Sequence, residues 1–183
     1  MATNKAWKKD LIELVFKLIF LAGVFLVSLL FVFGVVISPD DSMSQAVKPG
    51  DIVFYYRMNQ KYPTDSVIVL EKKGDKQVRR IVAGPGDEVA ITDEGLMVNG
   101  NLRTNPEITH PTLPYKGKVK YPLKLQANQY FVLGDYRMDV ADSREYGVVN
   151  QSEIKGSVMT IIRTKRFLGQ INAENNPRNK YYC

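Results

Sequence analysis

Ser42 is the residue whose chemistry the sequence raises first. It lies in the stretch SPDDSMSQAVKPGD, directly after the longest uncharged run of the chain, and Met43 follows it. To open a peptide bond, a serine hydroxyl needs a base that takes its proton, donors for the developing oxyanion, and neighbours that fix its geometry. The other interpretation of Ser42 is an ordinary serine in a turn.

Histidine is a poor candidate for the base that such a nucleophile needs. The single histidine, His110, lies in a Pro-rich stretch, and a histidine there is usually solvated. The remaining common solution is a serine–lysine pair, in which an apolar environment keeps the lysine neutral. The single cysteine, Cys183, excludes an intramolecular disulfide and a cysteine-based zinc site.

The first element that positions these residues is a membrane segment. From Leu18 to Ser38 the chain has no charged residue, and a helix over this run would cross a hydrocarbon core of about 30 Å. A cleaved signal peptide would have an apolar region of only about 7–15 residues and a small-x-small cleavage site. We therefore predict an uncleaved, single-pass signal anchor at 18–38. The lysines of segment 1–17 predict that this segment is cytoplasmic and that the rest lies outside the plasma membrane.

After Pro49 the sequence changes to short strand-like runs. Residues with β-branched and aromatic side chains alternate with Gly, Asp, Asn and Pro, as in GDIVFYYR, DSVIVLEK and QYFVLGDYR. The stretch EVAITDEGLMVNGN predicts a hairpin around Asp93-Glu94-Gly95 and a second tight turn at Asn99-Gly100. We expect a mostly β domain over 39–168, with an irregular loop at 102–128, and a polar C-terminal tail over 169–183.

The charge of the chain leaves a less specific function open. The 183 residues carry a formal net charge of +6, which could suit anionic lipid or nucleic acid. The positive residues are scattered along the chain, and the predicted location outside the membrane argues against nucleic acid. A membrane-tethered β domain that binds lipid through its basic surface is the simplest alternative to an enzyme.

Three stretches of this chain resemble, in order and in spacing, those of the bacterial type I signal peptidases. DSMSQAVKPGD resembles the segment in which the nucleophilic serine precedes methionine. RRIVAGPGDEV, from Arg79 to Val89, is similar to the Lys-Arg-hydrophobic segment that ends in Pro-Gly-Asp. GDYRMDVADSREYG, from Gly134 to Gly147, resembles the segment Gly-Asp-x-Arg…Asp-Ser-Arg…Gly. Together they span most of Ser38 to Arg163, behind an N-terminal anchor.

The resemblance implies a fold and a set of roles. It implies coiled antiparallel sheets and a cleft beside the membrane, in which an extended signal peptide docks as an added strand. It gives Ser42 the role of nucleophile, and it makes Asp142 and Arg144 a pair that braces the site. A solvated surface salt bridge is the alternative for this pair. The other positions to which the resemblance gives supporting roles are Met43, Gly134, Asp135 and Ser143.

The resemblance fails at the general base. The family's lysine aligns with Arg79, and arginine keeps its proton at any working pH, so it cannot accept one from Ser42. Lys76 is three residues away along a strand, which predicts the opposite face. Val140 replaces a serine that usually helps to orient the lysine. Asp40 replaces a Gly or Ser that contributes to the oxyanion hole, where a carboxylate would oppose the developing negative charge. A general base is typically worth about 10²–10⁴ in rate, so the replacement of the lysine by Arg79 should slow catalysis severely.

Two functions follow from the resemblance, and the residues do not decide between them. In the first, the chain is a membrane-anchored signal peptidase that binds, and with Ser42 cleaves, the signal peptides of secreted preproteins. In the second, it is a pseudo-enzyme like the signal-peptidase-like proteins of Gram-positive pilus gene clusters. It would then hold a pilin subunit and assist polymerisation by a sortase. Membrane lipid is an expected partner in both cases, and no cofactor, metal or nucleic acid is expected in either.

Overall fold

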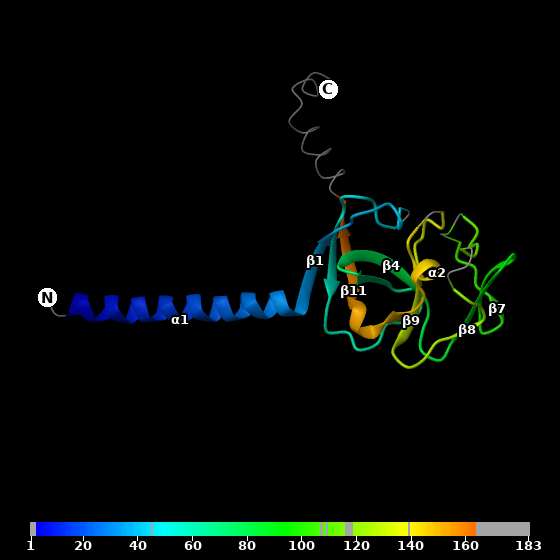
Figure 1. Ribbon diagram of the computed structural model, residues 1–183. Helices are drawn as coiled ribbons and strands as arrows, with labels where there is room; N and C mark the ends of the chain where they lie inside the picture. The colour runs from blue at the N-terminus through cyan, green and yellow to red at the C-terminus, as the bar shows by residue number, and fades with distance from the viewer. Residues whose placement is uncertain are drawn as a thin grey trace, which may run out of the picture.

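The protein consists of a long N-terminal helix and a β domain (Figure 1). The computed structural model describes residues 3–44, 46–106, 108, 110–115, 119–138 and 140–163. The helix is α1 (Thr3–Val32). The elements that follow it are β1 (Phe33–Ile37), β2 (Ile52–Tyr56), β3 (Val67–Lys72), β4 (Asp75–Ala83), β5 (Glu88–Thr92), β6 (Gly95–Val98), β7 (Asn101–Leu102), β8 (Leu123–Lys124), β9 (Gln129–Leu133), α2 (Ser143–Tyr146), β10 (Val149–Asn150), the 3₁₀ helix η1 (Gln151–Glu153) and β11 (Ile154–Ile162).

The apolar N-terminal helix that the sequence predicts is present. Its segment Trp7–Val32 is long and apolar enough to cross a membrane, with a mean hydropathy of 2.7. In Figure 1, α1 extends away from the β domain as a single rod, and the most apolar part of the segment is not buried against the domain. Such a helix can serve as a membrane anchor.

The predicted end of this helix at Ser38 is wrong. α1 ends at Val32, and the next five residues form β1, which pairs antiparallel with β2. An unbroken apolar run does not by itself distinguish a helix from a buried strand, and β-branched residues here favour the strand. Gly34 allows β1 to pack closely on β2, because a Cβ at this position would lie 2.1 Å from the ring of Tyr55. The β domain therefore begins with β1 and not at residue 39.

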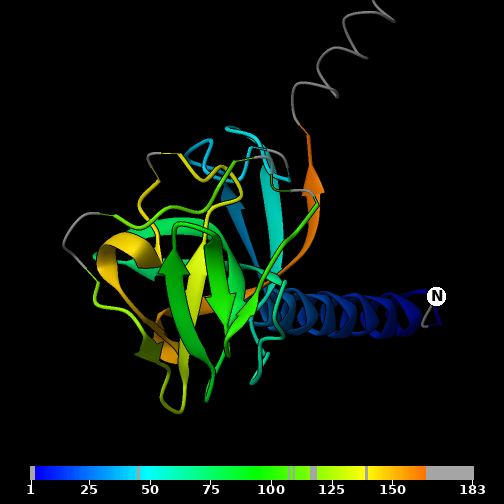
Figure 2. The ribbon, with the colours of Figure 1, turned by 90° about the vertical axis from the view of Figure 1, so that its right-hand side faces the viewer.

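The strands of the described residues form two antiparallel sheets, as expected for a mostly β domain. The larger sheet has seven strands in the order β1-β2-β11-β3-β4-β9-β10, and the smaller has four in the order β7-β6-β5-β8. The register shifts where β11 meets β2 and β3, and where β4 meets β9, and such bulges increase the twist that coils a sheet. The small sheet lies at the end of the domain farthest from α1 (Figures 1 and 2).

The predicted hairpin and tight turn in the small sheet are confirmed. The last pair of residues between β5 and β6 is Thr92 and Gly95, so Asp93 and Glu94 form the connection. Asn99 and Gly100 connect β6 to β7 with φ values of 52° and 78°, as a turn with two left-handed residues requires. The predicted tail at 169–183 lies outside the described residues.

Clusters of buried apolar side chains fix the position of the candidate site in the domain. One cluster lies beneath the segment between β1 and β2 and consists of Met43, Val47, Val53, Tyr55, Val69 and Val78. A second cluster, which includes Val82, Leu96 and Phe131, packs the small sheet against β4 and β9. Full burial of one such side chain stabilises the fold by roughly 1.5–3 kcal/mol. The segment around Ser42 is thus anchored by its own neighbour, Met43.

Candidate active site

Ser42 lies in the connection between β1 and β2, and both ends of this connection are fixed. The N–H of Ser38 donates to the carbonyl of Asp51 at 2.8 Å, and the N–H of Gly50 donates to the carbonyl of Ser38 at 3.0 Å. Met43 is fully buried in the core, and Ser42 itself is 3% exposed. The hydroxyl of Ser42 is therefore held inside the domain and does not project from a solvated turn.

The residues that follow β9 contact the segment around Ser42. The N–H of Tyr136 donates to the carbonyl of Ser42 at 2.8 Å, and the N–H of Asp135 lies 3.4 Å from the sulfur of Met43. A Cβ on Gly134 would lie 2.7 Å from the carbonyl oxygen of Ser42. Close approach of the two backbones therefore requires glycine at position 134.

The structure brings Arg79 of β4 to Ser42. Nη1 of Arg79 donates to Oγ of Ser42 and, at 2.7 Å, to the carbonyl of Val78. Nε and Nη2 donate to the carbonyl of Ala141 at 3.1 and 2.9 Å. Arg79 is 1% exposed. The position to which the resemblance assigns the general base thus holds a buried, fully engaged donor, and a guanidinium has no lone pair with which to accept a proton.

Asp40 binds both of these residues. Its Oδ1 accepts a hydrogen bond from the hydroxyl of Ser42 and, at 3.1 Å, from the N–H of Ser42. Its Oδ2 accepts from Nη2 of Arg79 at 3.3 Å. The sequence predicts only that the charge of Asp40 would repel an oxyanion. In the structure, Asp40 also occupies the donors of Ser42 directly.

Asp142, Ser143 and Arg144 are buried, so the alternative of a solvated surface salt bridge is wrong. Nη2 of Arg144 donates to Oδ2 of Asp142 at 2.9 Å, and the N–H of Gly134 donates to the same oxygen at 3.3 Å. Oγ of Ser143 accepts from the N–H of Val132 in β9 at 3.0 Å. The pair therefore ties α2 to the strand end that packs on Ser42.

Asp135 and Val140 act at a greater distance from the hydroxyl of Ser42. The carboxylate of Asp135 accepts two hydrogen bonds from Arg80, at 2.8 and 2.7 Å, which join the strand end after β9 to β4. Val140 is buried, and its Cγ1 lies 2.8 Å from where a Cβ of Gly134 would be. An apolar side chain at position 140 offers no hydrogen bond to a base.

Tyr115 is a site residue that the sequence pattern did not indicate. Its hydroxyl accepts from the N–H of Val140 at 2.8 Å and donates to the carbonyl of Val140 at 3.0 Å. The ring lies 4.8 Å from the guanidinium carbon of Arg144. Tyr115 thereby fixes the backbone next to Ala141, whose carbonyl holds Arg79. Tyr115 lies in the irregular loop after β7, where the sequence has no periodic pattern that would predict which side chains are buried.

Tyr146 is a second residue near the candidate site that the sequence pattern did not indicate. Its hydroxyl lies 3.3 Å from Oε1 of Gln77. Burial raises the pKa of Tyr146 above its ordinary value, and the positive charge of Arg79 opposes this rise only in part. The phenol therefore keeps its proton at neutral pH and does not replace the missing base.

The chain matches one protein family along most of its length. The family model described as signal peptidase, peptidase S26, matches residues 11–163. The chain belongs to the signal peptidase family.

Individual signal peptidases are similar to the chain at lower coverage. Signal peptidase IB of Staphylococcus aureus strain Mu50 is 26% identical over 175 residues, which cover 82% of this chain and 88% of that protein. Signal peptidase I of Bacillus amyloliquefaciens is 28% identical over 142 residues, which cover 69% of this chain and 74% of that protein. Among solved structures, a signal peptidase I from Enterococcus faecalis V583 is similar over 55% of this chain and 98% of that chain, with 26% identity and a TM-score of 0.41.

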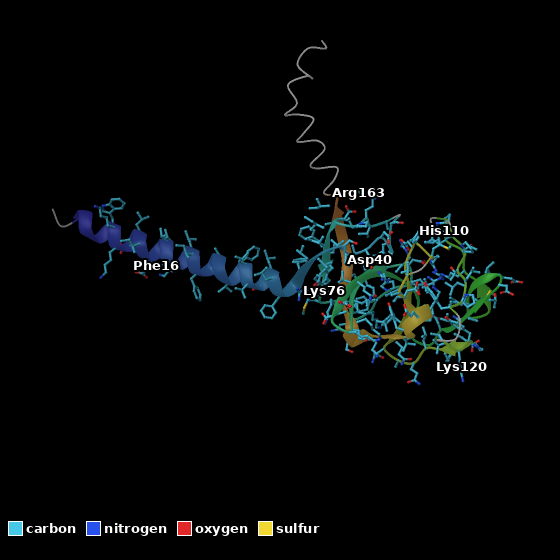
Figure 3. The ribbon with its side chains drawn as sticks, turned by 45° about the horizontal axis from the view of Figure 1, so that its top comes forward. Phe16, Asp40, Lys76, His110, Lys120 and Arg163 are labelled. Atoms are coloured by element: carbon cyan, nitrogen blue, oxygen red, sulfur yellow. The ribbon has the colours of Figure 1, made fainter. Side chains whose placement is uncertain are left out.

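The candidate site lies beside an open cleft of about 560 Å³ between the end of β1 and the start of β4. Asp40 and Lys76 lie on the half of the domain nearest to α1 (Figure 3). Lys76 is exposed, whereas Arg79 is buried beside Ser42. The lining residues are Val36, Ile37, Pro39 and Asp40 on one wall and Gly74, Asp75, Lys76 and Gln77 on the other.

The β1 wall presents backbone groups toward the cleft. β1 is the first strand of its sheet and pairs on one side, with β2. The N–H of Ser38 donates to Asp51, on the β2 side. Bonding groups alternate along an antiparallel strand, so Val35 and Ile37 direct their N–H and C=O groups away from β2. That side has no strand partner among the described residues.

β4 forms the other wall of the cleft and has a strand partner on both sides along only part of its length. β4 pairs with β3 along its length, whereas its pairing with β9 begins at Arg80. The N–H of Ile81 donates to Ser66, on the β3 side, and alternation therefore turns the backbone of Lys76 and Val78 the other way. The carbonyl of Val78 already accepts from Arg79. The backbone of Lys76 is left facing the cleft.

A second hollow has a volume of about 360 Å³, and Ser42 is not among its lining residues. Its lining includes Arg80, Leu96, Arg103, His110 and Arg137. Burial lowers the pKa of Arg137 to about 10, which leaves it charged at neutral pH. Within the described part of the chain, no cluster of three or more His, Cys, Asp or Glu side chains is arranged to hold a metal ion.

Proposed function

We propose that this signal peptidase family member is a membrane-anchored protein that binds the signal-peptide region of secreted proteins in extended form. The bound peptide lies in the cleft between β1 and β4. Cleavage at Ser42 is slow. The observation that carries the proposal is the pair of half-paired strands that face one cleft beside Ser42.

The two walls provide what an added strand requires. A peptide that joins a sheet edge gains main-chain hydrogen bonds, and its alternate side chains enter pockets on the wall. The backbones of Val35, Ile37 and Lys76 supply the hydrogen-bonding groups. Val36, Ile37 and Pro39 supply an apolar lining on the β1 side, which suits the small apolar residues expected near the end of a signal peptide.

The chemistry of the site supports binding more than turnover. The hydroxyl of Ser42 donates to the carboxylate of Asp40 and accepts from Arg79, so its proton acceptor is a weakly basic group that is paired with a guanidinium. Without an efficient general base, the rate should fall by about 10²–10⁴. Binding through backbone hydrogen bonds does not depend on that proton transfer.

The anchor gives the proposed orientation. Lys5, Lys8, Lys9 and Lys17 precede the apolar span, and positive flanks are retained in the cytoplasm. The β domain then lies on the outer face of the plasma membrane. Val35 and Ile37, directly after α1, have exposed apolar side chains that suit contact with lipid and with a signal peptide that leaves the membrane.

A second candidate function is the holding of a pilin subunit for polymerisation by a sortase, without cleavage. The observation that favours it is the hydroxyl of Ser42, which is fully engaged by Asp40 and Arg79. Both functions use the same cleft. They differ in whether Ser42 matters: Ser42→Ala should abolish any residual cleavage of a preprotein but should leave pilus assembly intact.

The experiment measures binding of a fluorescent signal-peptide fragment to the full chain in detergent micelles. Ile37→Pro removes one N–H from the cleft edge while leaving the bonds to β2 in place, because proline is tolerated on an edge strand. Loss of one backbone hydrogen bond costs about 0.5–1.5 kcal/mol, a roughly two- to tenfold weaker affinity. The matched control, Ile37→Ala, keeps the N–H and should bind more tightly than Ile37→Pro. Equal affinity for both variants, or no binding by the unmodified chain, would refute the proposal.

A further inference from the structure

Three donors of the site converge on one carboxylate. The N–H and the hydroxyl of Ser42 both donate to Oδ1 of Asp40, and Nη2 of Arg79 donates to Oδ2. A backbone N–H, a hydroxyl and a guanidinium are donors that recognise anionic oxygens. A carbonyl oxygen that gains negative charge during attack by Ser42 would require a donor such as the same N–H.

Asp40 lies between these donors and the cleft. Its carboxylate side chain is 39% exposed, whereas that of Arg79 is 2% exposed. Asp40 is part of the cleft lining, and neither Ser42 nor Arg79 is. A peptide in the cleft therefore meets the carboxylate of Asp40 before it can reach the hydroxyl of Ser42.

The buried charge of Arg79 determines what can replace Asp40. An uncompensated buried charge is strongly destabilising. The amide carbonyl of an intact peptide is neutral, so its entry in place of Asp40 would leave Arg79 without a counter-charge. A carboxylate brings a full negative charge and restores the pair.

We propose that the Ser42 N–H and hydroxyl and the Arg79 guanidinium form a carboxylate-binding site, which Asp40 fills in the resting protein. The external ligand class that fits this site is the C-terminal carboxylate of a peptide in the cleft. The inference rests on the proposed function only for the peptide; the site itself is independent of it. It also gives a reason, besides the absence of an efficient base, why cleavage of an internal peptide bond at Ser42 is slow.

The test is an acetate titration of the full chain in detergent micelles, with thermal unfolding as the readout. Asp40→Ala vacates the site, and acetate should raise the unfolding temperature of this variant, since a ligand that binds the folded state stabilises it. The unmodified chain should not respond beyond a matched chloride control. Asp40→Ser, which suits a turn, serves as the second vacated variant. The double variant Asp40→Ser/Arg79→Ala should lose the response.

A second measurement compares one signal-peptide fragment with a free carboxylate and with an amidated C-terminus. A hydrogen bond to a charged group contributes about 1.5–3 kcal/mol, so Asp40→Ser should prefer the carboxylate roughly 10- to 150-fold. The unmodified chain should prefer it less, because Asp40 competes for the site.

The outcomes separate the inference from the proposed function. Absence of an acetate response in both Asp40→Ala and Asp40→Ser would overturn the inference, even if peptides bind the cleft. An acetate response in the unmodified chain as large as in the variants would also overturn it. If neither peptide binds any variant but acetate stabilises the vacated ones, the carboxylate site stands and the proposed peptide function fails.

Discussion

A lysine at position 79 should not restore cleavage while Asp40 is present. In Arg79→Lys, burial favours the neutral amine, whereas a carboxylate about 4 Å away favours the ammonium by about 4 kcal/mol at an effective dielectric constant near 20. The Asp40 side chain is 39% exposed, so solvent screens this attraction. About 1.5–3 kcal/mol remains, the usual contribution of a hydrogen bond to a charged group. Its removal in Arg79→Lys/Asp40→Ser should raise the neutral fraction of the amine roughly 10- to 150-fold.

The assay compares initial rates of preprotein cleavage at pH 7.5–8, with the full chain in detergent micelles. Arg79→Lys alone should gain less than about tenfold, and the double variant about 10²-fold or more, because a general base is worth about 10²–10⁴. Ser42→Ala in the double background should remove the gain. Urea unfolding of each variant shows whether the fold is intact.

Two results would refute this reasoning. If Arg79→Lys alone is as active as the double variant, Asp40 does not hold the amine in its charged form. If the double variant is no faster than the unmodified chain, the missing base is not what limits cleavage.

Three further predictions concern the supports of the site and of the sheet. Tyr115→Phe removes two backbone hydrogen bonds and should lower the free energy of unfolding, measured in urea, by about 1–3 kcal/mol. Asp142→Ala leaves Arg144 buried without its partner, so the same measurement should show a larger loss, about 3–5 kcal/mol; a loss below 1 kcal/mol would show that the pair is not buried. Burial alone would raise the pKa of Glu153, but hydrogen bonds led by that from Lys72 outweigh it and lower the pKa. The stability that this carboxylate contributes, less than about 1 kcal/mol relative to Glu153→Gln, should be full above pH 5 and lost as the pH falls below 4; a constant difference over this range would contradict the assignment.

The sequence predicted those elements that local pattern determines. The runs rich in β-branched residues form strands, and Asn99-Gly100 forms a tight turn, because the conformational preferences of these residue types favour both structures. The end of α1 could not be predicted in this way: apolarity continues past Val32, and only pairing with β2 and the close contact at Gly34 make the next residues a strand.

The candidate site was partly predictable for a similar reason. Three stretches in family order located Ser42 and Arg79, and the structure brings these two side chains together. The partner of each donor depends on tertiary geometry. The sequence therefore identified Asp40 only as an unfavourable charge, and it gave no position to Tyr115, whose hydroxyl reaches the backbone of Val140 across the fold.

The most direct test of the central claim is amide hydrogen exchange, measured residue by residue by NMR, with and without an amidated signal-peptide fragment. A peptide strand in the cleft should slow exchange of the N–H groups of Val35, Ile37 and Lys76, which face the cleft edges. Unchanged exchange at these three residues, or protection confined to the second hollow around Arg103, would contradict binding between β1 and β4.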